Sequence, residues 1–273
     1  MRVAAIQLAY TDSEPMAERI HRVASLVESQ EGADLVVLPE LWSAGGFDYP
    51  AWPDKAQDVE GPVAQALSEA AANLGAYVHA GSIIEKSGEP GPEGRGLWNT
   101  SMVFDPDGEL VGTYRKIHRF GFGNGEPKLL EAGEDVVVLD LDEPSPEDES
   151  GSNSVKVGLA TCYDLRFPEL FRKQVDEGAE IFVIPAAWPA ARIAAWRTLL
   201  QARAIENQVF VIACNTAGTH AKTEMGGNSA VISPSGEVLA EAGRGERVLT
   251  LDIDVDEVRA ARESFPVLSD RRL

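Results

Sequence analysis

The chain repeats itself: three segments of its first half recur, in the same order, in its second half. The matching pairs are Arg2–Ala4 with Lys156–Gly158, Ala33–Trp42 with Ala179–Trp188, and Ser101–Leu110 with Ser229–Val238. Common strand and turn patterns are the alternative explanation, but they do not account for the shared order. The repeat therefore predicts one domain, residues 1–273, built from two similar halves related by a pseudo-two-fold axis.

Short apolar runs alternate with helical patterns in both halves. The runs are continuously apolar, which is typical of strands covered on both faces, and this order predicts an α/β fold. The expected strands are Val3–Leu8, Asp34–Leu38, Tyr77–Ile84, Thr100–Phe104, Leu110–Lys116, Val155–Thr161, Ile181–Ile184 and Val209–Cys214. The expected helices are Glu14–Gln30, Pro62–Leu74, Pro168–Glu177 and Ala194–Glu206, with hairpins around Asp105–Gly108 and Ser233–Gly236.

Composition disfavours several classes of function. The 273 residues carry 24 Lys and Arg against 44 Asp and Glu, a net charge of −20, whereas nucleic-acid binding needs clustered cations. No apolar run approaches the about 18 residues that a membrane span requires. Two cysteines are too few for a disulfide framework, so we expect a cytoplasmic protein. The acidic segment Asp140–Ser154 is expected to be an exposed loop that joins the halves.

Reactive side chains lie at the ends of three of the expected strands, where ligands bind in α/β proteins. Glu40 ends the apolar run Leu35–Pro39 and is a candidate general base, or else a solvated side chain. Lys116 is a candidate oxyanion stabiliser, or else an exposed lysine. His118 is a weaker candidate base, since a lone histidine more often packs or forms hydrogen bonds.

Cys162 lies at a strand-to-helix turn. Backbone N–H groups and a helix N-terminus at such a turn lower the pKa of a thiol, and the N–H of Tyr163 is then a candidate oxyanion donor. The alternatives are a buried structural cysteine, which fits Cys214 better, and a redox pair of the two cysteines. Asp164 and Arg166 are candidates to pair across the turn.

Signals for a metal or a nucleotide are weak. None of the four histidines lies four residues from another or close to a cysteine. The run Gly121–Gly125 does not join a strand to a helix with phosphate-loop spacing, and we interpret it as a flexible active-site loop. Trp188 and Trp196 are expected to line a pocket or an interface, with core packing as the alternative.

Three segments, Leu38–Trp42, Tyr114–His118 and Thr161–Leu170, resemble the signature segments of the nitrilase (carbon–nitrogen hydrolase) superfamily. Similarity also extends to Trp196–Gln208, to Gly227–Val231 and to the tail from Phe265, so the resemblance covers essentially the whole chain. It implies a four-layer αββα sandwich that pairs into a homodimer or a higher homo-oligomer. It also accounts for the internal repeat.

The resemblance also implies a site. The superfamily's Glu, Lys and Cys fall on Glu40, Lys116 and Cys162, and a second, substrate-positioning glutamate falls on Glu126, with Glu131 as the fallback. These residues imply a hydrolase that cleaves an amide through a cysteinyl acyl-enzyme and releases ammonia. No metal or organic cofactor is implied.

Within the superfamily, Ala187–Pro189 and the helix pattern after it look most like the ω-amidase branch, which hydrolyses short dicarboxylate monoamides such as 2-oxoglutaramate. N-carbamoyl amino acids, deaminated glutathione and nitriles are the alternative substrates for the same residues. A non-catalytic ligand-binding scaffold is the alternative of a different class.

A small amide with a distal carboxylate needs a cationic pocket. Arg166, Arg192 and Lys116 are the candidate cations. Tyr163 and Trp188 are the further residues expected to contact the substrate.

Overall fold

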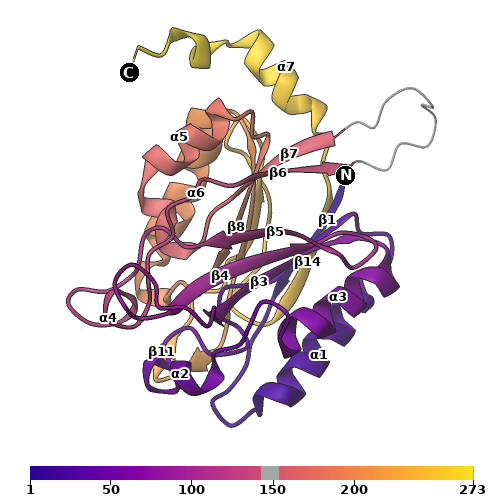
Figure 1. The fold of residues 1–273 in the computed structure, drawn as a ribbon. Coiled ribbons are helices and arrows are strands. Elements are labelled where there is room, and N and C mark those ends of the chain that lie inside the picture. Colours follow the sequence, from indigo (N-terminus) through magenta and orange to yellow (C-terminus); the bar gives the residue numbers. More distant parts are fainter. Residues whose placement is uncertain (143–153, 273) are drawn as a thin grey trace.

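The computed structural model describes residues 1–142 and 154–272. Two six-stranded sheets lie face to face at the centre, and helices cover the outer side of each (Figure 1). Helices α1 (Met16–Glu28) and α3 (Pro62–Leu74) cover the first sheet, and α5 (Pro168–Asp176) and α6 (Ile193–Asn207) cover the second. The predicted αββα sandwich is confirmed.

The first sheet has the strand order β14-β1-β2-β3-β4-β5. Strands β1, β2 and β3 run parallel, and the other neighbours pair antiparallel. The strands are β1 (Arg2–Gln7), β2 (Leu35–Val37), β3 (Tyr77–Lys86), β4 (Leu97–Phe104), β5 (Leu110–Arg115) and β14 (Arg247–Asp252).

The second sheet has the order β6-β7-β8-β9-β12-β13, with β7, β8 and β9 parallel and the other pairs antiparallel. Its strands are β6 (Val138–Asp142), β7 (Ser154–Leu159), β8 (Ile181–Ala186), β9 (Phe210–Asn215), β12 (Ala230–Ile232) and β13 (Val238–Glu241). The two sheets therefore share one pairing pattern. The three repeated sequence segments match β1 with β7, β2 with β8 and the β4–β5 hairpin with β12–β13, so the pseudo-two-fold repeat is confirmed.

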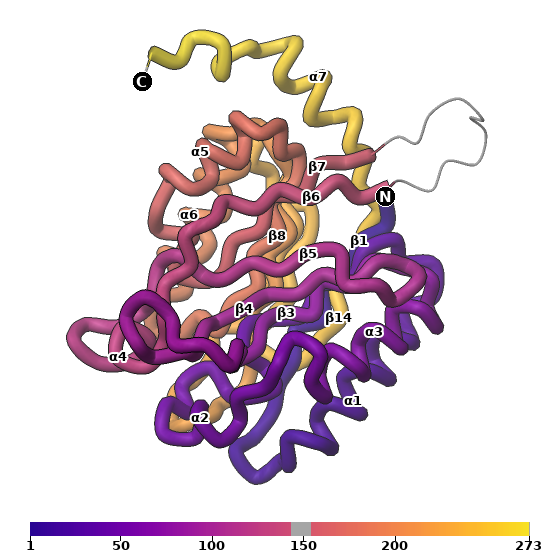
Figure 2. Tube along the Cα trace, viewed as in Figure 1, coloured from indigo at the N-terminus to yellow at the C-terminus, as the bar shows by residue number. Residues whose placement is uncertain are grey.

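The remaining described elements are short or peripheral. They are α2 (Trp52–Lys55), α4 (Glu126–Leu129), α7 (Asp256–Ser264), β10 (Thr219–His220), β11 (Thr223–Glu224) and the 3-10 turns η1 (Tyr49–Ala51), η2 (Cys162–Arg166), η3 (Ala190–Arg192) and η4 (Val267–Asp270). Figure 2 shows α4 on a loop at the left edge of the view and α7 running across the top towards the C-terminus. Among the described helices, none is long and apolar enough to span a membrane.

Both faces of the central strands of the first sheet are buried, as their continuously apolar sequences predict. Along β1 and β2, side chains alternate between the two faces. Val3, Ala5, Leu35 and Val37 join the core shared with the second sheet, and Ala4, Ile6 and Val36 pack with α1 and α3. A strand buried on both sides places the residues at its end deep in the molecule.

The expected loop Asp140–Ser154 is wrong at its ends. Asp140–Asp142 belong to β6, and Ser154 begins β7 as the partner of Asp142. The centre of that segment, 143–153, lies outside the described residues. Strands β6 and β14 and helix α7 were not predicted, because edge elements bury only part of their surface and carry little apolar signal.

The backbone of Gly81 in β3 packs closely against the chain just before Glu40. Its φ is +68°, and a Cβ there would lie 1.9 Å from the carbonyl oxygen of Pro39, directly before Glu40. Gly75 has a similar φ of +70°, but a Cβ added to Gly75 would have no atom within 4 Å. We expect Gly75→Ala to lower the free energy of unfolding by about 1 kcal/mol through backbone strain alone. Gly81→Ala should lower it by about 3 kcal/mol or more, because the backbone must also shift.

Urea unfolding of both variants measures the difference. Equal losses would show that the strand end adapts without cost.

Candidate active site

The turn that carries Cys162 is strained and capped. Cys162 has a φ of +48° and begins η2, three residues after Leu159, the last residue of β7. The N–H of Thr161 donates to Oδ2 of Asp164 at 2.9 Å, and the N–H of Asp164 donates to the carbonyl oxygen of Thr161 at 3.0 Å. Cys162 therefore lies in a short closed turn between β7 and α5, at the strand-to-helix turn that was predicted.

Asp164 is fully buried and ties this turn to the neighbouring segment. It accepts hydrogen bonds from the hydroxyl of Tyr114 at 2.7 Å and from the N–H of His118 at 2.9 Å. Nδ1 of His118 lies 2.7 Å from the same carboxylate, and its ring stacks on Phe167 at 3.7 Å. His118 therefore has a structural position. The expected pairing of Asp164 with Arg166 is wrong, because Asp164 is already occupied by these donors.

One buried ammonium group lies between two carboxylates. Nζ of Lys116 is 2.7 Å from Oε1 of Glu40 and 2.9 Å from Oε1 of Glu126. The three residues are 2%, 2% and 4% exposed, so water screens this cluster very little. Glu40 follows β2, Lys116 follows β5, and Glu126 begins α4. The structure thus brings together the three residues that the motifs singled out around Cys162.

Two groups that hold Glu40 were not predicted. Nδ2 of Asn99 in β4 donates to Glu40 at 2.8 Å and to Glu126 at 3.2 Å. The backbone N–H of Ala187 donates to the other oxygen of Glu40 at 2.8 Å. For Asn99, the sequence offered one signal: an amide side chain within the strand Leu97–Phe104. A backbone donor leaves no mark in the sequence.

The cluster controls the ionisation of its members. Burial raises the pKa of Glu126, with Lys116 opposing and Glu40 adding to the rise. Burial alone lowers the pKa of Lys116, but the charges of Glu126 and Glu40 outweigh it and raise this pKa well above its ordinary range. Lys116 therefore stays an ammonium ion at neutral pH.

The expectation that the Cys162 pKa falls is wrong. Burial raises the pKa of this thiol well above its ordinary value of 9.0, and the negative charge of Glu40 raises it further while Lys116 lowers it. Burial and the carboxylate of Glu40, which is distant in sequence, outweigh the effect of the turn on the thiol pKa. The resting thiol is therefore protonated and needs a base before it can attack.

These groups lie at the buried end of one pocket. Its lining residues are Glu40, Gly46, Phe47, Tyr49, Lys116, Phe120, Glu126, Cys162, Tyr163, Arg166, Ala187, Trp188, Pro189 and Arg192. Arg166 and Arg192 are exposed, whereas Cys162 is 8% exposed. The pocket therefore has a buried reactive end and a cationic mouth, and it includes every residue expected to contact the substrate.

The Gly-rich run Gly121–Gly125 folds back beside this pocket. The N–H of Glu126 donates to the carbonyl oxygen of Phe120 at 3.1 Å, and the N–H of Phe120 donates to the Glu126 carboxylate. This double contact places Phe120 in the pocket wall and Glu126 beside Lys116. The run Gly121–Gly125 itself does not line the pocket, but it connects two residues that do.

Several other expected residues lie elsewhere. Glu131 accepts hydrogen bonds from the backbone of Glu93, Arg95 and Gly96 and does not line the pocket, so the fallback for Glu126 is not needed. Trp196 is buried, and its indole N–H donates to the carbonyl oxygen of Asn228 at 2.8 Å, which makes it a core residue.

Both cysteines are free thiols in the described structure. Cys214 lies inside β9, and its Sγ is 3.2 Å from the carbonyl oxygen of Ile6. Burial raises its pKa strongly. These surroundings fit the structural cysteine that its apolar segment predicted.

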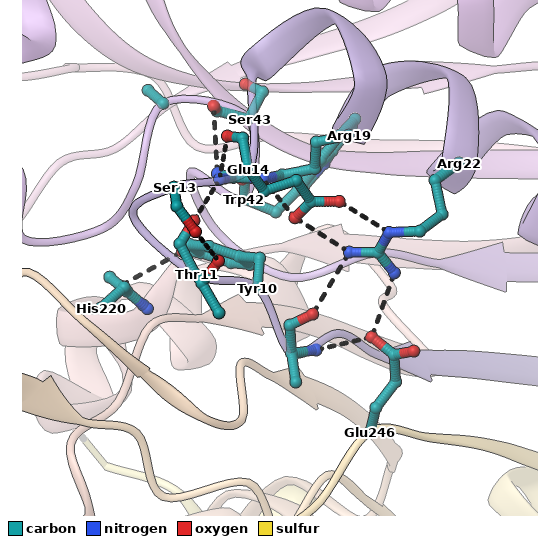
Figure 3. A network of polar contacts seen from close by, with 12 residues as sticks. Tyr10, Thr11, Ser13, Glu14, Arg19, Arg22, Trp42, Ser43, His220 and Glu246 are labelled. Carbon is teal, nitrogen blue, oxygen red and sulfur yellow. Dashed lines mark hydrogen bonds and ion pairs between the residues drawn. The ribbon is translucent and has the colours of Figure 1, made fainter.

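A polar network anchors the loop that follows Glu40 (Figure 3). The buried guanidinium of Arg19 donates to the carbonyl oxygens of Trp42 at 2.9 Å and Ser43 at 3.4 Å, and it pairs with Glu14 at 3.1 Å. It also lies 4.1 Å from the ring centre of Tyr10. Helix α1 therefore holds the backbone that carries Gly46 and Phe47 into the pocket wall.

Comparison with known proteins identifies the family of this chain. Residues 2–263 match the carbon-nitrogen hydrolase family. The 2-oxoglutaramate amidase of Paenarthrobacter nicotinovorans is 46% identical over 270 residues, which cover 99% of this chain and 89% of the relative. The omega-amidase NIT2 of Bos taurus is 33% identical, with 99% and 95% covered.

A solved structure supports the fold as well. The CN-hydrolase superfamily protein XC1258 from Xanthomonas campestris, described with an arsenic adduct in its active site, has a TM-score of 0.86 and 32% sequence identity. The superposition covers 100% of this chain and 97% of that structure. The chain belongs to the carbon-nitrogen hydrolase family, and it is an enzyme that acts as an amidase.

Proposed function

We propose that the enzyme is an ω-amidase that hydrolyses the terminal amide of short dicarboxylate monoamides such as 2-oxoglutaramate. The observation that carries the chemistry is the buried Glu40–Lys116–Glu126 cluster beside Cys162 in one pocket. The 46% identity to a 2-oxoglutaramate amidase supports the substrate class. The catalytic domain is the whole chain.

The first half of the reaction forms an acyl-enzyme. Glu40 takes the proton of the Cys162 thiol as Sγ attacks the amide carbon. This base is needed because the raised pKa keeps the resting thiol protonated. Two N–H groups of the Lys116 ammonium face carboxylates, so its third N–H is available to the oxyanion, together with the N–H of Tyr163. The protonated Glu40 then returns its proton to the departing nitrogen, which leaves as ammonia.

The second half frees the product. Water attacks the thioester carbonyl while Glu40 again accepts a proton, and Cys162 leaves as the thiol. Glu126 has a different role: its carboxylate, fixed by Phe120 and Lys116, positions the amide nitrogen of the substrate. Trp188 and Tyr163 form apolar walls for the carbon chain.

Ammonia release from 2-oxoglutaramate, succinamate, glutamine, an N-carbamoyl amino acid and an aliphatic nitrile tests the proposal. We expect rapid turnover of the first two only. Cys162→Ala should abolish it, and Glu40→Gln should lower kcat by about 10²- to 10⁴-fold, the usual contribution of a general base. Cys214→Ala, which removes the other buried thiol, is the matched control and should keep activity.

Added hydroxylamine separates the proposed intermediate from direct water attack. An acyl-enzyme gives hydroxamate in place of part of the acid. Formation of acid alone at all hydroxylamine concentrations, or activity that survives Cys162→Ala, would contradict the mechanism.

We also propose that the enzyme works in the cytoplasm as a homodimer. Its two free cysteines support a reducing compartment. The segment after α7 supports association, because it leaves Phe265 70% and Val267 39% exposed. We expect sedimentation velocity to give a dimer at micromolar concentration, and a monomer throughout that range would contradict this state.

A further inference from the structure

Two guanidinium groups at the pocket mouth lack an acidic partner. Within residues 1–142 and 154–272, the side chains of Arg166 and Arg192 form no hydrogen bond or ion pair. The carboxylates of the pocket, Glu40 and Glu126, are both occupied by Lys116. In a chain with a net charge of −20, two cations without an acidic partner meet at the opening of this pocket. Such a pair favours an anionic ligand.

Each guanidinium lies over an aromatic ring of another segment. Arg166, from the turn that begins with Cys162, lies 5.1 Å from the ring of Trp188. Arg192 lies 5.2 Å from the ring of Phe120. A ring orients a guanidinium without neutralising its charge, so its N–H groups stay available to a carboxylate.

The backbone of Arg192 is firmly held. Its N–H donates to the carbonyl oxygen of Pro189 at 3.0 Å, and its own carbonyl accepts the indole N–H of Trp188 at 2.9 Å. It also directly precedes the 15-residue helix α6. Phe120, beneath its guanidinium, is bonded through its backbone to Glu126. Arg192 is therefore fixed to the Glu126 side of the pocket, whereas Arg166 belongs to the Cys162 side.

We propose that Arg192 determines substrate specificity by binding the carboxylate at the end of the substrate opposite the amide. This inference rests on the proposed function and deepens it. The amide occupies the buried end beside Cys162, and the carboxylate lies at the exposed mouth. Neutral amides of the same length then lack the contact, although they reach the same catalytic groups.

Succinamate and butyramide form a matched pair, because a carboxylate in the first replaces a methyl group in the second. We expect Arg192→Gln to lower kcat/KM for succinamate and 2-oxoglutaramate by about 10- to 100-fold, as for a lost charge-assisted hydrogen bond. Its kcat/KM for butyramide should stay within about twofold of the wild type. Arg244→Gln, at a side chain 75% exposed, removes the same charge elsewhere and should change neither.

Two results would overturn the role of Arg192. The first is an unchanged kcat/KM for succinamate in Arg192→Gln. It would be clearest if Arg166→Gln instead lowered kcat/KM for succinamate. The second is an equal loss for succinamate and butyramide, which indicates damage to the pocket rather than to carboxylate binding.

A binding measurement separates this inference from the proposed function. Glutarate should slow the alkylation of Cys162 by iodoacetamide in the wild type, and Arg192→Gln should remove at least about nine-tenths of that protection. A wild type that hydrolyses butyramide but no carboxylate-bearing amide refutes the ω-amidase proposal. If glutarate still protects Cys162 in the wild type but not in Arg192→Gln, the carboxylate-binding role of Arg192 is supported even then. If glutarate protects neither protein, or protects both equally, that role is refuted.

Discussion

The active site depends on one buried ammonium group shared by two carboxylates. Lys116 offsets part of the charge of Glu40 and Glu126, and without it two buried carboxylates would face each other with little solvent. Removing one member of such a buried group costs about 3–5 kcal/mol, because the remaining charge loses its partner. With both glutamates ionised, the cluster has a surplus negative charge. Burial is the main cause that raises the pKa of Glu126 and of Cys162, and the charge of Glu40 adds to the rise in both, so the surroundings that hold the cluster also keep the nucleophile protonated at rest.

The repeated fold explains how these groups meet. Strands β2 and β8 occupy equivalent places in their sheets, and their ends converge on the same pocket: Glu40 follows β2, and the N–H of Ala187, just after β8, donates to its carboxylate. The two halves are not chemically equivalent, because the repeat places Ala186 where the first half has Glu40. The second half instead supplies Cys162, after the strand β7 that corresponds to β1. One asymmetric site thus arises from two similar frames.

The central strands and the repeat could be predicted, because continuous apolar runs and repeated segments are visible in the sequence. The family resemblance indicated Glu40, Lys116, Glu126 and Cys162 as site residues, and the structure brings these four together in one pocket. The part that failed was non-local. The thiol pKa was judged from the turn around Cys162, yet it is set by burial and by Glu40, far away in the chain. The bonds of Asn99 to both glutamates depend on which strands become neighbours, and a backbone donor such as Ala187 carries no side-chain signal. Edge strands such as β6 lack the continuous apolar run that made the central strands recognisable.

The pH dependence of Cys162 alkylation by iodoacetamide, read by peptide mass spectrometry, tests the central claim most directly. The account predicts a midpoint above the ordinary thiol value of 9.0 in the resting wild-type enzyme. Because a nearby negative charge disfavours the thiolate, Glu40→Gln should move this midpoint to lower pH, and Glu126→Gln should move it less far in the same direction. Cys214, with its own buried surroundings, should stay unmodified in the folded protein. A wild-type midpoint below 9.0, or substitutions that leave it unchanged or raise it, would contradict control of the nucleophile by the buried cluster.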